Sequence, residues 1–254
     1  MKIQYCSDLH LEFPENKEFL TRNPLPVKGD VLVLAGDIVP FAAMEKHEGF
    51  FGKLSDDFEQ TYWIPGNHEY YHFDIADKCG VLNEKIRDNV SLVNNISIVH
   101  DNVKLIFSTL WSKIRTAYQW QIERGMSDFH VIKYKGFRFS SERFNQLHLE
   151  SLRFVEQELN AERKGKAVVV THHVPTLMNY PDKYKGDVLN NAFAVELFEL
   201  IKARGPDCWI YGHTHHNTPG FKIGNTQMLT NQLGYVRYGE DQWFKGGQYI
   251  DFDK

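Results

Sequence analysis

Six short segments of the chain consist mostly of apolar, often β-branched residues, and polar residues end or follow each of them. Runs that are apolar throughout, without alternating polar positions, indicate strands that are buried on both faces of a sheet. The segments lie at 3–6, 31–35, 62–64, 104–109, 167–170 and 209–211. The sequence therefore predicts six buried strands.

Helical patterns lie between several of these strands. Residues 140–163 begin with Ser140, a residue suited to capping a helix, and continue with apolar residues at helical spacing. Residues 193–201 show the same spacing, and Gly205-Pro206 is a stop signal. Residues 226–252 look more like short strands joined by glycine-rich turns. Strands that alternate with helices predict an α/β fold with a mixed sheet.

Residues capable of chemistry gather where the predicted strands end. Asp, Asn or His residues follow five of the six strands, and Asp8 and Asp37 occupy equivalent places. In open α/β sheets, ligands bind beyond the carboxyl ends of the strands. Seven of the 12 histidines lie at these ends: His10, His68, His172, His173, His213, His215 and His216. The pattern predicts one functional site at a sheet edge.

The side chains at these strand ends are of the kinds that bind transition metals. Imidazole and carboxylate groups together suit Zn, Fe, Mn or Ni, whereas an all-oxygen set would suit Mg or Ca. Cysteine is almost absent from the cluster, which disfavours a structural thiolate zinc site. The candidate ligands are too many for one tetrahedral ion. Two ions that share a bridging carboxylate would use them all.

Five blocks of the sequence, taken in order, resemble the calcineurin-like metallophosphoesterase family. The blocks are Asp8-x-His10, Gly36-Asp37, Gly66-Asn67-His68-Glu69, His172 after a strand, and Gly212-His213-x-His215. Most of the blocks taken singly could be ordinary turns, but independent turns have no reason to reproduce the ordered set. The resemblance implies a four-layer αββα sandwich, in which helices flank two mixed β-sheets and a dinuclear metal site lies at the sheet edge.

The resemblance also implies a role for each matching residue. His68 corresponds to the family's catalytic histidine, which stabilises the phosphorane oxygens or protonates the leaving group. The implied reaction is hydrolysis of a phosphodiester or phosphomonoester by a hydroxide that bridges two ions of Mn, Fe, Zn or Ni. The implied metal ligands are Asp8, His10 and His215 on the first ion, Asn67, His172 and His213 on the second, and Asp37 between them.

Several neighbouring residues have a less certain place in this scheme. His172 and His173 are adjacent, so their side chains diverge, and the family pattern favours His172 as the ligand. His216 fits better as a loop or supporting residue. Cys6 fits a buried strand position, with a redox role as the alternative. Glu69 is expected to orient a neighbour by hydrogen bonding.

Residues 111–144 interleave basic and aromatic side chains, and two interpretations stay open. The segment is either a cap, whose cations bind phosphate oxygens and whose rings bind a base or sugar, or an insertion with its own small core and solvated charges. Its basic residues include Lys113, Arg124 and Arg138, and its rings include Trp111, Phe129 and Phe139. We expect a single domain, 1–254, with a cap-like insertion at 111–144.

Composition limits the classes of binding partner and the cell compartments that fit this chain. The net charge of −4 over 254 residues shows no basic surplus, which disfavours nucleic acid without excluding it. The three cysteines form no paired motif, which fits a reducing compartment. There is no signal-peptide pattern and no run of the roughly 20 apolar residues that a membrane span needs. We expect a cytoplasmic protein with a small phosphorylated substrate, a nucleotide among the candidates, and no membrane partner.

Differences between this sequence and the motifs of particular subfamilies indicate which activities of the family are less favoured. Protein phosphatases of this family carry Asp-Arg-Gly shortly after the Gly-Asp block and Arg before Gly-Asn-His-Glu. In this chain Ile38 follows Gly36-Asp37 and Pro65 precedes Gly66, so both arginines are missing. The lipid A pathway hydrolases have Arg at the position of His68. The sequence therefore favours a small bacterial-type phosphoesterase. The alternatives are a nuclease relative and a non-catalytic scaffold. The intact set of expected ligands disfavours the scaffold.

Overall fold

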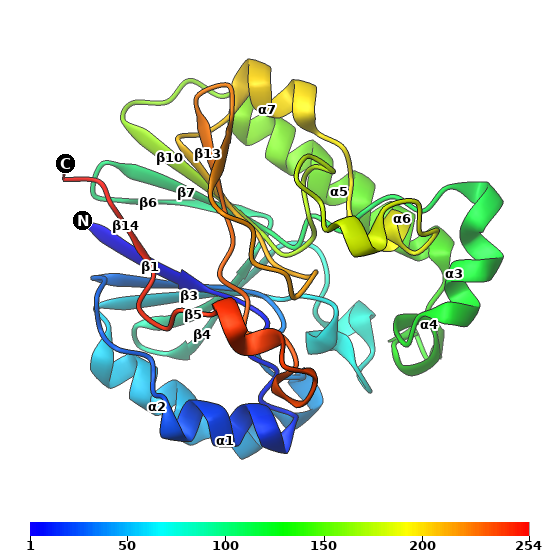
Figure 1. The fold of residues 1–254 in the computed structure, drawn as a ribbon, viewed down its shortest axis with the longest axis horizontal. Coiled ribbons are helices and arrows are strands. Elements are labelled where there is room, and N and C mark those ends of the chain that lie inside the picture. The colour runs from blue at the N-terminus through cyan, green and yellow to red at the C-terminus, as the bar shows by residue number, and fades with distance from the viewer. Residues whose placement is uncertain (254) are drawn as a thin grey trace.

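The computed structural model describes residues 1–253, and in this range two six-stranded mixed sheets pack face to face (Figure 1). In each sheet four central strands run parallel, and an antiparallel strand lies at either edge. The first sheet has the order β14 (Tyr249–Asp251), β1 (Lys2–Cys6), β2 (Val31–Ala35), β3 (Gln60–Ile64), β5 (Val90–Asn94) and β4 (Leu82–Arg87). The second has the order β12 (Phe221–Ile223), β13 (Thr226–Leu229), β11 (Cys208–Ile210), β10 (Lys166–Thr171), β7 (Val103–Ser108) and β6 (Ile96–His100).

Helices cover the outer face of each sheet. Figure 1 shows α1 (Pro14–Arg22) and α2 (Glu48–Asp57) below the first sheet, and α5 (Ser141–Asn160) and α7 (Phe198–Arg204) above the second. The result is the four-layer αββα sandwich that the sequence predicted. Within residues 1–253 no helix is long and apolar enough to cross a membrane.

The alternation of side chains along each strand explains why the strand sequences are apolar throughout. Along β2, Val31 and Val33 are buried between the two sheets, whereas Leu32 and Leu34 pack in the layer with Phe51 of α2. Because successive side chains of a strand point to opposite faces, a strand covered on both sides is apolar at most positions. Each of the six predicted strands forms, with its ends within two residues of the prediction.

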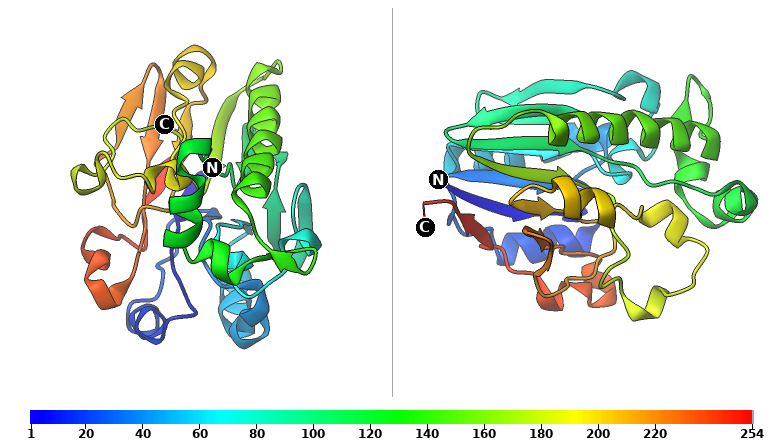
Figure 2. Two further views of the ribbon diagram at one scale, coloured as in Figure 1. Left: turned by 90° about the vertical axis from the view of Figure 1, so that its right-hand side faces the viewer. Right: turned by 90° about the horizontal axis from the view of Figure 1, so that it is seen from above.

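The carboxyl ends of the parallel strands meet at one end of the sandwich, opposite the two chain termini (Figure 2). Short elements gather at that end: α3 (Gln119–Gly125), α4 (Asp128–Val131), the hairpin of β8 (Lys133–Tyr134) and β9 (Phe137–Arg138), and α6 (Asn190–Phe193). Two 3₁₀ helices also lie near it, at His68–Tyr70 and Val236–Tyr238. Loops that a rigid sheet holds in place are where functional groups concentrate.

The C-terminal segment ties the two sheets together at this end. After β13 of the second sheet, residues 231–234 run beside the end of β1 in the first sheet. Ser7 N–H donates to Asn231 O at 3.1 Å, Leu233 N–H donates to Ser7 O at 3.1 Å, and Gly234 N–H donates to Asp8 O at 3.1 Å. The loop that carries Asp8 is therefore held from both sheets.

The helix predicted over 193–201 is wrong in its extent. Helix α6 ends at Phe193 and α7 begins at Phe198, because the chain between them pairs with the loop after β10. Val174 N–H donates to Phe193 O at 3.1 Å, and Val195 N–H donates to Val174 O at 3.0 Å. These hydrogen bonds use backbone groups that a continuous helix would have needed. Strands β4, β5 and β6 and helices α1 and α2 had no prediction.

The N-terminal cap of α5 gives a test of this part of the fold. The hydroxyl of Ser140 accepts a hydrogen bond from Arg143 N–H at 3.3 Å, as the sequence predicted for a capping serine. Ser140→Ala removes this acceptor and should lower the free energy of unfolding by about 1 kcal/mol in urea titrations. Ser140→Asp should retain most of the stability, since its carboxylate caps the same N–H group. Equal losses in both variants would contradict the cap.

Candidate metal centre

Two groups of buried ligand atoms share the carboxylate of Asp37. In each group the atoms lie within 4.8 Å of one another. The first group consists of Asp8, His10, Asp37 and His215, and the second of Asp37, His172 and His213. The ligands come from the carboxyl ends of β1, β2, β10 and β11, and thus from both sheets. A carboxylate that belongs to both groups can offer one oxygen to each of two cations.

The histidine rings of the first group fit a cation between them. Nε2 of His10 lies 2.9 Å from Nε2 of His215. On the far side of each ring, Nδ1 faces a carboxylate, Glu12 at 3.2 Å for His10 and Glu240 at 2.8 Å for His215. A neutral ring that donates from Nδ1 has a lone pair on Nε2, so two lone pairs face each other. A positive ion removes this repulsion, and carboxylates behind the rings are the usual partners of metal-binding histidines.

The second group converges on Nε2 of His172. Its other nitrogen, Nδ1, donates to Ala35 O at 2.9 Å, so in the neutral ring Nε2 carries the lone pair. That atom lies 3.3 Å from Asp37 Oδ2, 3.3 Å from Asn67 Oδ1 and 3.1 Å from His213 Nδ1. Burial lowers the pKa of His213 well below its usual value, so this ring is neutral and can offer a lone pair. The donor set fits a divalent transition metal.

The backbone of the ligand loops adopts an uncommon conformation. Five of the expected ligands have φ in the left-handed region, which non-glycine residues rarely occupy. They are Asp8 at 56°, His10 at 47°, Asp37 at 57°, His213 at 81° and His215 at 51°. Such strain persists where surrounding contacts impose it, and it is commonest at functional sites. Here the sharp bends turn side chains from neighbouring strands toward a common centre.

Two glycines leave room for the carboxylates of the site. A Cβ atom on Gly66 would lie 2.2 Å from Asp37 Oδ1, and a Cβ atom on Gly212 would lie 2.6 Å from Asp8 Oδ2. Both distances are far shorter than any non-bonded contact allows. The glycines before Asn67 and His213 are thus required by the close approach of the carboxylates.

Glu69 holds two ligand loops together. Its buried carboxylate accepts from the backbone N–H of Asp37 at 2.9 Å and of Gly66 at 2.5 Å, and from Trp63 Nε1 at 3.1 Å. Burial raises the pKa of Glu69 to about 7, while these and other N–H donors favour its ionised form. The expectation that Glu69 orients its neighbours agrees with these contacts, which link the loops after β2 and β3.

His68 lies beside the two groups and lines the adjacent pocket. Its Nδ1 is 2.9 Å from Glu12 Oε1, and its Nε2 is 3.2 Å from the hydroxyl of Tyr235. Burial raises the pKa of Glu12, but hydrogen bonds to His10 and His68 outweigh this and hold it at about 2. Neither Glu12 nor Tyr235 is among the residues expected from the sequence. Glu12 continues the alternation of Asp8 and His10, whereas nothing in the sequence distinguishes Tyr235.

Three residues considered from the sequence lie outside both groups. Nδ1 of His173 is 3.3 Å from Thr109 O, and its ring packs against Trp111 at 5.1 Å between centroids. His216 is half-buried and belongs to neither ligand group. Cys6 is buried in the core, and burial raises the pKa of its thiol, so the thiol stays protonated. Of the adjacent pair, it is therefore His172 that points at Asp37.

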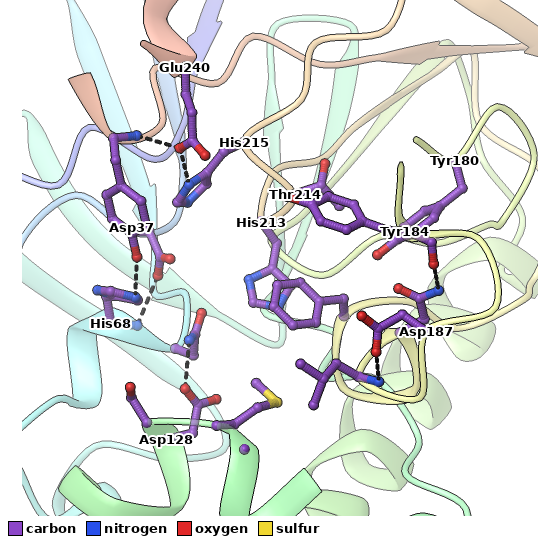
Figure 3. A pocket seen from close by; sticks show the side chains of 18 of the residues that line it. Asp37, His68, Asp128, Tyr180, Tyr184, Asp187, His213, Thr214, His215 and Glu240 are labelled. Carbon is purple, nitrogen blue, oxygen red and sulfur yellow. Dashed lines mark hydrogen bonds and ion pairs between the residues drawn. The ribbon is translucent and has the colours of Figure 1, made fainter. Parts of the chain in front are cut away.

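A cavity of about 300 Å³ opens beside the ligands. Figure 3 shows Asp37, His68 and His215 on one side, with Asp128 below His68, and Tyr180, Tyr184 and Asp187 on the other side. Among the described residues that line the cavity there is no Lys or Arg, and residues 111–144 contribute Gly125, Met126, Ser127 and Asp128.

The basic and aromatic side chains of 111–144 have other surroundings. The guanidinium of Arg124 lies over the Trp120 ring at 4.6 Å, and Arg138 donates to Glu123 O at 3.0 Å. The rings of Phe129 and Phe139 stack at 5.8 Å in the same core cluster as Trp111. Several rings of this segment therefore belong to the core, whereas Trp120 and Phe137 are exposed, and its cations do not line the cavity.

Comparisons with known proteins agree with this architecture. An uncharacterised protein of Acanthamoeba polyphaga mimivirus is 31% identical over 280 residues, which cover 99% of this chain and 97% of that protein. The solved structure of phosphopantetheinyl hydrolase from Mycobacterium tuberculosis superimposes with a TM-score of 0.75, covering 100% of this chain and 97% of that one. The identity to that hydrolase is 14%, so the match shows a shared fold.

A family model decides the classification. The model of the calcineurin-like phosphoesterase family matches residues 1–217, a range that contains both ligand groups and His68. The members of this family are metal-dependent phosphoesterases, as the motifs had indicated. The chain belongs to the calcineurin-like phosphoesterase family.

Proposed function

We propose that this protein hydrolyses a phosphomonoester or phosphodiester bond in a small substrate, using two divalent transition-metal ions. The observation that carries this proposal is the convergence of the two ligand groups on Asp37. The proposed ligands are those expected from the motifs: Asp8, His10 and His215 for one ion, Asn67, His172 and His213 for the other, and Asp37 for both. Ions held there would neutralise the phosphate and lower the pKa of water.

Other groups of the chain hold the carboxylates of the site in place and supply a proton donor. Backbone N–H groups of His68 and His213 donate to the carboxylates of Asp37 at 2.9 Å and Asp8 at 3.0 Å, which fixes their oxygens. Glu12 holds Nδ1 of His68, so Nε2 of that ring faces the cavity side, next to Tyr235. From this place His68 can stabilise the phosphoryl oxygens or donate a proton to the leaving alcohol.

The cavity supports a small substrate. Its volume of about 300 Å³ is at the lower end of small-ligand sites. Tyr71, Tyr180, Tyr184 and Phe193 supply apolar contact area, and the absence of Lys and Arg from its described lining gives no site for further phosphates. This lining favours a substrate with one phosphate over nucleic acid, whose binding depends on basic contacts. A nucleoside monophosphate stays among the candidates.

Metal dependence gives the first test. The protein loaded with Mn²⁺ should hydrolyse p-nitrophenyl phosphate or bis-p-nitrophenyl phosphate, and a chelator should abolish the reaction. Asp37→Ala should lose at least one ion and nearly all activity, because this carboxylate belongs to both ligand groups. Release of p-nitrophenol and elemental analysis of the desalted protein provide the measurements. A fully metal-loaded protein that is inert on every phosphoester tried would contradict the proposal.

Replacing His68 should lower the turnover number and leave metal binding unchanged. His68→Ala is expected to retain both ions while kcat falls by about 10²- to 10⁴-fold, the usual contribution of a general acid. His72→Ala is the matched control, since His72 is exposed four residues away and does not line the cavity. Steady-state kinetics and elemental analysis together decide the point. Loss of metal from His68→Ala would show that this ring is a ligand instead.

The space beside Gly66 gives an independent test of the geometry. In Gly66→Ala the new methyl group would collide with Asp37 and His172, so we expect loss of bound Mn²⁺ and of activity. Gly52→Ala in α2 is the control, because a Cβ there meets nothing within 4 Å, and it should be neutral or stabilising by about 0.5–1 kcal/mol. If Gly66→Ala binds two ions normally, the ligand geometry described above is wrong.

A further inference from the structure

Asp128 is a buried carboxylate that no motif announces and that belongs to neither ligand group. It is the first residue of α4, within 111–144, and its exposed fraction is 1%. Its Oδ1 atom accepts a hydrogen bond from Asn67 Nδ2 at 3.0 Å and another from the Tyr71 hydroxyl at 2.8 Å. The insertion thus contacts an expected metal ligand through an acid and not through one of its many basic residues.

The contact with Asp128 determines which end of the Asn67 amide faces the metal site. An asparagine amide has an oxygen that can bind a cation and an NH₂ group that cannot. The Oδ1 atom of Asp128 acts as an acceptor here, so Asp128 selects the NH₂ end of the amide. The amide oxygen of Asn67 then points the opposite way and lies 3.3 Å from Nε2 of His172.

The same oxygen of Asp128 also reaches the catalytic side of the site. The hydroxyl of Tyr71 donates to it, and the ring of Tyr71 stacks on His68 with centroids 4.0 Å apart and planes at 24°. Asp128 therefore connects Asn67 and Tyr71, which both lie in the segment that follows β3. One carboxylate supports both a metal ligand and the ring packed against the proposed proton donor.

Stability alone does not account for this carboxylate. Among the described residues, the second oxygen of Asp128, Oδ2, has no hydrogen-bond partner. A buried carboxylate with an unpartnered oxygen costs free energy, and an apolar residue of similar size would avoid that cost. A group retained at such a cost needs a role that an apolar residue cannot fill.

We propose that Asp128 is a positioning residue of the second metal site, which holds the Asn67 amide oxygen toward a divalent cation. The inference rests on the proposed function for the identity of the site, but it concerns metal affinity and not hydrolysis. Partners behind the ligands typically change metal affinity by about 10- to 100-fold when they are removed. Asp128 acts through Asn67, so its effect must vanish where Asn67 is absent.

Calorimetric titration of the metal-free protein with Mn²⁺ tests the inference. Asp128→Leu should weaken the second ion by about 10- to 100-fold and leave the first unchanged. Asp128→Asn retains an acceptor oxygen and should bind both ions within about threefold of the wild-type affinity. Tyr71→Phe removes the other donor to the same oxygen and should also leave both affinities unchanged. Circular dichroism checks folding, and Asp128→Ser replaces the leucine variant if that one does not fold.

A double-mutant cycle separates positioning from a general structural effect. Asn67→Leu should weaken the second ion by itself, and adding Asp128→Leu should cause no further loss. Additive losses, or wild-type affinity in Asp128→Leu, would overturn the inference. These outcomes are independent of hydrolysis. A protein that binds two ions and cleaves no phosphoester would refute the proposed function and leave the affinities to decide the role of Asp128.

Discussion

Burying several carboxylates and imidazoles at one point is the constraint around which this structure is organised. Asp8 and Asp37 are almost completely inaccessible to solvent, and ring nitrogens of His10 and His172 lie within hydrogen-bond distance of other acceptors. Such an arrangement is unfavourable without compensating positive charge. The strained backbone, the glycines without room for a Cβ and the backbone contacts of Glu69 all serve to hold ligand atoms in this crowded arrangement. The two sheets supply the rigidity that makes it possible.

The sequence predicted the features that one strand or one motif encodes locally. The buried strands were visible because a layer on either side forces every position to be apolar, as in Val31–Ala35. The edge strand Ile96–His100 alternates exposed and half-buried positions and gave no such signal. The helix over 193–201 was overextended because its break depends on hydrogen bonds to Val174, which propensity cannot reveal. The motifs include every member of the two groups that share Asp37.

Three of the residues that the sequence missed contact the site from elsewhere in the chain. Glu240 and Tyr235 come from the C-terminal segment beyond the family match, and Asp128 comes from residues 111–144. No spacing rule connects such positions, since their partners are set by tertiary packing. Residues 111–144 also show that composition alone does not identify the groups that reach a site. Their basic residues suggested phosphate contacts, yet the side chain from this segment that contacts Asn67 is the acidic Asp128, and Phe129 and Phe139 pack in the core.

Residues 231–234 pair with the loop that carries Asp8, so the site combines the first and the last parts of the chain to be synthesised. Asp8 and His10 leave the ribosome early, but the backbone partner of Asp8 at Gly234 and the carboxylate behind His215 at Glu240 are made much later. A nascent chain therefore exposes isolated ligands long before a complete cluster exists. The full set of side chains around Asp37 is assembled only when both sheets have closed. The site is therefore a property of the folded chain and not of any segment made on the way to it.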